Sequence, residues 1–300
     1  MLPDEPVRPT PVEDQGSGLP RCHRHPDRET GVSCTRCGRP VCPECMVPAS
    51  VGFQCPDCVH GAAAERQVRP RTAFGGVLSL GDGALVTKVL IGLNLLVFLL
   101  TEYVSRQWQV RLGLVSWAPL PGLRFGMAEG PQEWYRLVTA MFVHGGLLHI
   151  ATNMFSLWVI GPQLERALGR VRFLGLYLVS GIAGNALAFV LSPPSEQLFS
   201  VGASGAIFGL LGATAVLFRV NRIPMQPVIA LLVVNLVITF SLKGIDWRAH
   251  IGGLVAGVVI GAGMMYAPRA HRNLVQGLTT VAVLAVGLGL VLLGMARLPG

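Results

Sequence analysis

The chain has 300 residues, of which 51% are hydrophobic and only 13% are charged, and its mean hydropathy is +0.54. Soluble globular domains carry about 25% charged residues, so this composition excludes an ordinary soluble domain and predicts a polytopic membrane protein. The formal net charge is +8, a value that counts every cysteine thiol as neutral, so the charge does not predict nucleic-acid binding. The first thirty residues contain no apolar core, which predicts the absence of a cleaved signal peptide.

All seven cysteines lie between Cys22 and Cys58, so a cysteine-rich N-terminal part precedes an apolar body. Residues 1–20 are proline-rich and lack hydrophobic periodicity, which predicts a disordered tail. Over 21–60, four pairs of potential metal ligands follow, each separated by two residues, so that both side chains of a pair can reach one tetrahedral ion. The pairs are Cys22 and His25, Cys34 and Cys37, Cys42 and Cys45, and Cys55 and Cys58. Eight ligands predict two closed, structural Zn²⁺ sites.

The intervals between the pairs alternate in length, which favours an interleaved arrangement of pairs one and three with pairs two and four. This spacing resembles the cross-brace of B-box and RING-type zinc fingers. Sequential pairing is an alternative, His23 could replace His25, and disulfides are a further alternative that the odd cysteine count and the histidine disfavour. A domain this small needs metal to fold. Free thiols indicate a reducing compartment, so we expect a cytoplasmic zinc domain that binds a cytoplasmic protein partner, followed by a linker over 61–84.

The body contains seven apolar stretches near the length of about 20 residues that a spanning helix needs. The fifth is the weakest, because Pro224 and Pro227 shorten it. The predicted spans are 85–104, 147–165, 172–191, 199–218, 226–242, 248–267 and 274–295. The segment 105–146 between the first two spans is rich in Trp and Tyr, which favour the membrane–water interface. We expect it to be partly helical and to lie in the outer leaflet.

If the N-terminus is cytoplasmic, the odd-numbered spans run from the cytoplasm outward and the even-numbered spans run inward. Eleven basic residues then flank the cytoplasmic ends and seven flank the opposite ends, a bias in the direction that the positive-inside rule requires. The sequence therefore predicts a multi-pass protein of the cell membrane, with the lipid bilayer as its surroundings.

Four polar residues fall at similar depth in the outer leaflet, although they come from three predicted spans. Ser204 lies about five residues into the fourth span, His250 near the outer end of the sixth, and His149 and Asn153 in the first turns of the second. Intramembrane polar residues are costly and usually face a cavity or each other. Their common depth predicts that they form one site.

The residue types favour nucleophilic catalysis. A serine hydroxyl needs a base, and His250 is the base at that depth. No acidic residue lies at that level inside a span, which predicts a Ser–His dyad. His149, Asn153 and the backbone N–H of Ser204 could stabilise an oxyanion. The repeats Gly205-x3-Gly209 and Gly253-x3-Gly257-x3-Gly261 would let spans four and six approach closely. Structural alternatives remain: the serine could bond within its own helix, and the histidines, His144 included, could satisfy one another or line a proton path.

These residues belong to a series of motifs, and the body of the chain resembles rhomboid intramembrane serine proteases in those motifs. The matching elements, in the order and spacing of that family, are Trp134-Tyr135-Arg136, His144-x4-His149-x3-Asn153, Glu165-x3-Gly169, Gly202-Ala203-Ser204-Gly205 and Ala249-His250-x2-Gly253-x3-Gly257. The resemblance implies an all-α fold with a six-helix rhomboid core over 85–267, and the seventh apolar stretch adds a C-terminal transmembrane helix within 268–300. It covers neither the zinc domain nor the seventh span.

The resemblance implies roles for individual residues. Ser204 would be the nucleophile and His250 the general base, with His149 and Asn153 in the oxyanion hole. Structural support would come from Arg136, Glu165, His144, Gly202, Gly253 and Gly257. Phe208 stands where many members carry a tyrosine that stacks on the base.

The activity that follows is cleavage of single-pass transmembrane substrates through an acyl-enzyme, with no cofactor needed for catalysis. Water would enter from the extracytoplasmic side, beneath loops 192–198 and 243–249, and substrate would enter laterally beside the fifth span. The alternatives are a catalytically inactive rhomboid-like protein that binds membrane clients, and a transporter that uses the intramembrane histidines.

Overall fold

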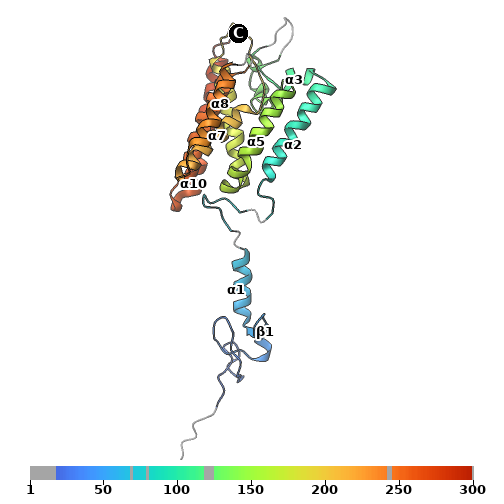
Figure 1. Cartoon of the computed structure of the whole chain (residues 1–300). Helices are drawn as coiled ribbons and strands as arrows, with labels where there is room; N and C mark the ends of the chain where they lie inside the picture. The colour runs from blue at the N-terminus through green and yellow to red at the C-terminus, as the bar shows by residue number, and fades with distance from the viewer. Residues whose placement is uncertain (1–17, 68–69, 79–80, 118–124, 242–244, 299–300) are drawn as a thin grey trace, which may run out of the picture. The chain divides into compact units, whose positions relative to one another are not determined.

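The computed structural model describes residues 18–67, 70–78, 81–117, 125–241 and 245–298. It divides into two compact units, residues 1–69 and 70–300, shown in Figure 1. Most of the tail predicted to be disordered, residues 1–17, lies outside the described residues. The other predicted domain boundaries remain predictions, although the predicted linker 61–84 contains the end of one helix and a hairpin over residues 70–78 that belongs to the second unit.

The N-terminal unit is built around cysteines. Its elements are a 3-10 turn η1 (Pro43–Cys45), strands β1 (Val47–Pro48) and β2 (Phe53–Gln54), which pair antiparallel, and helix α1 (Pro56–Gln67). Five of the seven cysteines are at most 2% exposed, and Val41 packs among them. A core of this size holds little apolar surface besides the thiols, so burial alone cannot balance the conformational entropy lost on folding.

The second unit is a helical bundle. Its long helices are α2 (Leu85–Leu99), α5 (Leu147–Leu168), α6 (Arg170–Leu191), α7 (Ser204–Val220), α8 (Gln226–Ser241), α9 (Trp247–Met265) and α10 (Arg272–Met295). Four helical stretches in the described chain are long and apolar enough to cross a membrane, or five if the bent pair ending in α5 counts as one span. Helices α7 and α8 are apolar but shorter. The predicted helical, multi-pass membrane fold is therefore confirmed.

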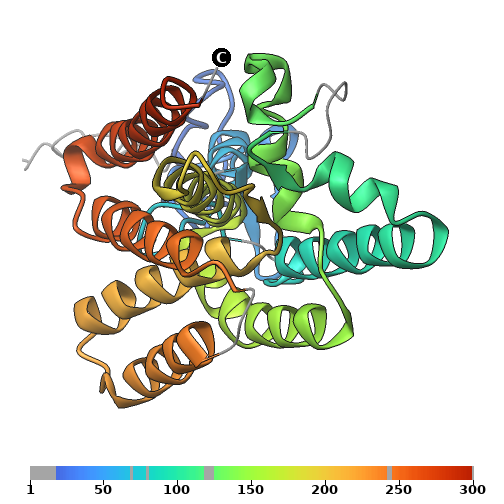
Figure 2. The same ribbon diagram turned by 90° about the horizontal axis from the view of Figure 1, so that it is seen from above.

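The bundle has a buried centre and an exposed rim. Helices α6 and α7 are lined with fully buried side chains, among them Tyr177 and Leu210, whereas only 17% of the apolar stretch of α10 is buried. Figure 2 shows α2, α8 and α10 at the edge of the bundle. Exposed valines and leucines on these rim helices are the expected surface of a protein solvated by lipid.

Shorter elements connect these helices. Between α2 and α5 lie η2 (Leu100–Val104), α3 (Gln107–Leu112), β3 (Leu114–Val115), η3 (Met127–Glu129), η4 (Pro131–Glu133), α4 (Arg136–Thr139) and η5 (Ala140–Phe142), and η6 (Arg269–His271) precedes α10. Strand β3 pairs antiparallel with β4 (Phe199–Ser200). The long segment before α5 is thus partly helical in its described residues, and it is tied to the chain entering α7.

The fourth helix begins five residues later than the predicted span. Residues 199 and 200 form β4, and Gly202 has a φ angle of +125°, which no right-handed helix contains. The placement of Ser204 several residues inside a helix was therefore wrong: Ser204 is the first residue of α7. The apolar run extended the prediction, because hydropathy alone does not separate a strand from the helix that follows it.

Helices α7 and α9 touch through their backbones. A Cβ atom on Gly253 would lie 1.9 Å from the carbonyl oxygen of Gly205, and one on Gly257 would lie 2.0 Å from the carbonyl oxygen of Gly209. Real Cβ atoms do not approach oxygens so closely, so only glycine fits at both positions. The glycine repeats thus mark the crossing that brings α9 against α7.

Candidate active site

Two polar side chains meet where α7 and α9 cross. The Nε2 atom of His250 lies 2.7 Å from the Oγ atom of Ser204. Ser204 opens α7, and His250 lies in the first turn of α9, so each side chain is fixed by a helix rather than by a loop. His250 is only 5% exposed. The structure therefore brings together the hydroxyl and the imidazole that the sequence singled out.

The imidazole of His250 is positioned by a stacking contact on its ring face as well as by the hydrogen bond at Nε2. Phe208 lies one helical turn after Ser204, and its ring stacks on His250 with centroids 4.3 Å apart and planes inclined by 14°. Spacing of i and i+4 places Ser204 and Phe208 on one face of α7. That face therefore supplies both the hydroxyl and the stacking ring.

A third residue, Thr239 of α8, contacts the other ring nitrogen. Its Oγ1 atom lies 2.8 Å from His250 Nδ1 and 2.7 Å from the carbonyl oxygen of Asn235. The carbonyl can only accept, so the threonine hydroxyl donates to it and accepts a hydrogen bond from Nδ1–H. Nε2 then carries the lone pair and accepts the hydrogen bond from Ser204. Sequence analysis missed Thr239, because a threonine in an apolar helix usually bonds one turn back, as this one also does.

The oxyanion-hole candidates are His149 and Asn153 of α5. A Cβ atom on Gly202 would lie 2.8 Å from His149 Nε2 and 3.6 Å from Ser204 Oγ, so His149 borders the serine and only glycine leaves room for its ring. Asn153 is one turn further along α5, and its Nδ2 donates to the backbone oxygen of His149 at 2.9 Å. The His144 ring packs edge-on against His149, with centroids 5.0 Å apart.

A cavity of about 210 Å³ lies between the two loops expected to cap the site. Its lining comes from residues 192–193 and 196–199 before α7 and from residues 245–248 at the start of α9. The same loops lead directly to Ser204 and His250. The hollow is therefore bordered by the described part of the capping loops, and neither Ser204 nor His250 is among its lining residues; residues 242–244 lie outside the described chain.

The N-terminal unit gathers its ligand-type side chains into two clusters of four. The ligand atoms within each cluster all lie within 4.8 Å of one another. One cluster contains Cys22, His25, Cys42 and Cys45, and the other contains Cys34, Cys37, Cys55 and Cys58. Each set can hold one metal ion, and three or four thiolates with tetrahedral spacing are the donor set typical of zinc. The grouping is the interleaved one.

His23 has another partner. Its Nε2 lies 3.1 Å from Asp57 Oδ2, and this hydrogen bond lowers the pKa of Asp57 below its ordinary value. In contrast, His25 Nδ1 lies 3.3 Å from Cys42 Sγ and 3.4 Å from Cys45 Sγ. His23 and Asp57 also lie near Cys55, but Cys55 already belongs to the four-cysteine cluster. The geometry therefore favours His25 over His23 as the ligand.

Residues 131–267 match the family model described as Rhomboid domain. A putative rhomboid protease of Bacillus subtilis, YdcA, is 40% identical over 144 residues, which cover 46% of this chain and 70% of that protein. The chain belongs to the rhomboid family. Rhomboid protease GluP of the same organism is 34% identical over 214 residues, 70% of this chain, and RHOMBOID-like protein 5 of Arabidopsis thaliana is 35% identical over 157 residues, 50% of this chain. The chain spans 40% of the former and 50% of the latter.

Arg136 stabilises the long segment between α2 and α5 by hydrogen bonds to its backbone. It is 1% exposed, and its Nη1 donates to the carbonyl oxygens of Val110 at 2.6 Å and Gly113 at 2.8 Å. Its Nε donates to Glu133. A buried guanidinium is costly unless its donors are satisfied, and here they close the loop between α3 and α4. We infer that Arg136 is structural.

Glu165, near the C-terminus of α5, binds the N-terminus of α2. Its carboxylate accepts hydrogen bonds from the backbone N–H of Val86 at 2.9 Å and of Thr87 at 2.8 Å, and from the Thr87 hydroxyl at 2.8 Å. These donors are at the N-terminus of α2, where unpaired N–H groups and the helix dipole favour an anion. Glu165 thus joins the end of α5 to the start of α2.

Proposed function

We propose that this rhomboid protein is an intramembrane serine protease that cleaves peptide bonds of transmembrane substrates. The observation that carries the proposal is the hydrogen bond of 2.7 Å between Ser204 Oγ and the buried His250 Nε2. The names of the relatives support the same activity, since GluP is called a rhomboid protease and a 33% identical protein of Emericella nidulans a rhomboid-type serine protease.

In the proposed reaction, Ser204 Oγ attacks the carbonyl carbon of the scissile bond while His250 Nε2 takes the hydroxyl proton. The tetrahedral oxyanion is stabilised by His149, Asn153 and the backbone N–H of Ser204. The C–N bond then breaks, and the leaving amine takes the proton from His250. Water attacks the acyl-enzyme by the same steps in reverse, which releases the acid and restores Ser204.

Thr239 acts as a positioning residue in this mechanism. By accepting from Nδ1–H it holds the imidazole in the tautomer whose Nε2 can receive the serine proton. Its hydroxyl takes the place that a carboxylate occupies in a Ser-His-Asp triad, where the third member orients the histidine. A neutral hydroxyl orients the ring without placing a second charge inside the membrane, where ionised groups are costly.

Replacing Thr239 with valine should lower kcat about 10- to 100-fold, the cost of one buried hydrogen bond of about 1–3 kcal/mol. KM should change little, and Thr239→Ser should restore most of kcat because it returns the hydroxyl. The measurement is steady-state cleavage of a reporter transmembrane substrate over a range of pH values. The pH profile of kcat should shift in Thr239→Val, which a merely structural loss would not cause.

The matched control is Thr214→Val. Thr214 is also a buried threonine that donates to a carbonyl one turn back, at 2.8 Å from Leu210 O, but it belongs to α7 and forms no hydrogen bond with a histidine in the described part of the chain. Its kcat should stay within about twofold of the wild-type value, since most changes away from a site have small effects. Equal losses of kcat in the two variants would show that Thr239 has no special role.

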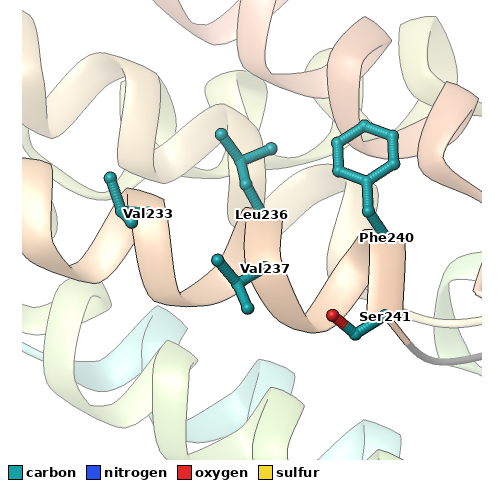
Figure 3. Close-up of a pocket in the computed structure, with 5 residues that line it drawn as sticks. All are labelled: Val233, Leu236, Val237, Phe240 and Ser241. Atoms are coloured by element: carbon teal, nitrogen blue, oxygen red, sulfur yellow. The ribbon is translucent and has the colours of Figure 1, made fainter.

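Substrate would reach the site beside α8. The C-terminal half of this helix lines an open hollow of about 370 Å³ with Val233, Leu236, Val237, Phe240 and Ser241 (Figure 3). Val237 and Phe240 are 58% and 64% exposed, although Thr239 between them is buried. A transmembrane substrate helix could pack on this apolar surface at the level of the site.

For the N-terminal unit we propose two structural Zn²⁺ ions, one in each four-residue cluster, with no vacant coordination position for chemistry. We further propose that this unit faces the cytoplasm and that the site opens to the other side of the cell membrane, in agreement with the bias of basic residues. A binding surface for a cytoplasmic protein remains the role that we propose for it.

A fluorophosphonate probe tests the proposed activity directly, because it reacts only with a serine that a base has activated. The full chain should be labelled stoichiometrically at Ser204, as mapped by peptide mass spectrometry. Labelling should disappear in His250→Ala. A chain that binds membrane clients without cleaving them would remain unlabelled at Ser204, and so would a transporter, which should instead move protons across liposomes.

A further inference from the structure

Three arginines meet at the end of the bundle where α6 and α10 begin. Arg172 belongs to the first turn of α6, Arg272 is the first residue of α10, and Arg71 lies in a hairpin over residues 70–78. A Cβ atom on buried Gly75 would lie 3.4 Å from Arg272 Nη1 and 3.6 Å from Arg172 Nη2. Arg71 Nη1 approaches the carbonyl oxygen of the same glycine at 3.5 Å. The three guanidinium groups therefore surround one short stretch of backbone.

No described carboxylate forms an ion pair with these arginines. The contacts of Arg172 are neutral: Nε donates to Gln276 Oε1 at 2.7 Å and Nη2 donates to Asn273 Oδ1 at 2.9 Å. The charges of Arg71 and Arg272 both act against that of Arg172. In contrast, the nearby residue Lys88 pairs with Asp82 at 2.7 Å. The cluster thus holds three like charges whose compensation the described chain does not supply.

Arg71 is exposed and Arg172 and Arg272 are half-buried, but Arg172 is held in place by a buried amide. Gln276 is 4% exposed, and its Nε2 donates to the carbonyl oxygens of Phe74 at 3.0 Å and Met264 at 2.7 Å, while its Oε1 accepts from Arg172. One buried amide therefore fixes the hairpin, the end of α9 and the first turn of α6. Gly76 presses on the end of α5, since a Cβ atom there would lie 2.0 Å from Leu168 O.

We propose that Arg71, Arg172 and Arg272 bind a phosphate group, supplied by the headgroup of an anionic phospholipid. Guanidinium groups bind phosphate oxygens in pairs of parallel hydrogen bonds. Arg172 and Arg272 lie in the first turns of α6 and α10, and a helix N-terminus favours an anion. The cluster lies where the apolar helices α6 and α10 begin, which is the depth expected for lipid headgroups, and basic pockets between transmembrane helices are typical headgroup sites. Free inorganic phosphate shares this chemistry and is separated by the experiment.

The test uses the full chain in detergent micelles that contain either phosphatidylglycerol or phosphatidylcholine, with native mass spectrometry to count bound lipid and a titration to obtain the Kd. The main variant is the double substitution Arg71→Gln/Arg272→Gln, which leaves the bonds of Arg172 in place. Its matched control is Arg219→Gln/Arg222→Gln, which removes the same charge after α7, at the same end of the bundle. A parallel titration uses inorganic phosphate with thermal unfolding as the readout.

We expect phosphatidylglycerol to bind the wild type and the control with similar Kd and the double variant at least tenfold more weakly. The same dependence on Arg71 and Arg272 with inorganic phosphate would support the phosphate site with a soluble source. Arg272→Lys, which keeps the charge but loses the planar pair of donors, should weaken binding at least threefold and serves if the double variant does not fold. Equal affinity in the wild type and in these variants would overturn the proposal.

Discussion

Replacing Ser204 with alanine should abolish cleavage of a reporter transmembrane substrate, with a fall in kcat of at least ~10³-fold. His250→Ala should have an effect of the same size. Nucleophile and base act as one unit, so removal of either costs about as much as removal of both. The measurement is cleavage in proteoliposomes, followed by gel mobility and by mass spectrometry of the two products.

Ser180→Ala provides the matched control. Ser180 is a fully buried serine of α6 that packs beside Gly209 of α7, and its contacts do not include His250. Cleavage by this variant should stay near the wild-type rate, and the double variant Ser204→Ala/His250→Ala should be no slower than either single variant. Undiminished cleavage by Ser204→Ala would show that the reaction uses another nucleophile or another protein.

Removal of metal should unfold the N-terminal unit and leave the bundle intact. The apparent binding free energy of a structural zinc ion is about 10–16 kcal/mol, which exceeds the stability that so small a core can supply. Elemental analysis of the full chain should give two zinc ions per molecule. After treatment with a strong chelator, limited proteolysis should cut within residues 21–60 while the thermal unfolding of the bundle is unchanged.

The two histidines of this unit supply a paired test. His25→Ala should lower the zinc content from two ions to one, because His25 shares a cluster with Cys22, Cys42 and Cys45. His23→Ala should retain both ions, since His23 bonds to Asp57. Loss of one ion in His23→Ala instead would reverse the assignment of the ligand, and zinc content of one in the wild type would contradict two closed sites.

Much of this architecture could be predicted because its signals are local in the sequence. Apolar runs of about 20 residues have few structures open to them in lipid, so the helices occupy the expected stretches. Pairs such as Cys34-x2-Cys37 report their chemistry by spacing alone. The glycines of α7 and α9 announced a close crossing, and that crossing explains how Ser204 and His250, 46 residues apart, come within hydrogen-bonding distance.

Other features depend on three-dimensional contacts that no local pattern records. The start of α7 was placed too early, because residues 199–203 are apolar or small whether they form a strand or a helix. Thr239 has the sequence surroundings of any threonine in an apolar helix, and only the position of α8 beside α9 gives its hydroxyl a histidine partner. The arginines of the phosphate site come from segments that are distant in sequence, so the sequence showed only a bias of charge.

The glycine contacts between α7 and α9 also separate the site into a tightly packed part, on these two helices, and a less constrained part on α8. Ser204 and His250 belong to two helices that are in direct backbone contact. The distance between the two side chains therefore cannot change much unless these glycine contacts are broken. Thr239 belongs to α8, a rim helix that lacks such glycine contacts in its described residues, and Val237 and Phe240 of that helix are exposed. Any displacement of α8 that breaks the Thr239 contact frees the imidazole to change tautomer. A substrate helix whose packing on the rim displaced α8 would therefore be thermodynamically linked to proton acceptance by the base, and each would change the other by the same free energy.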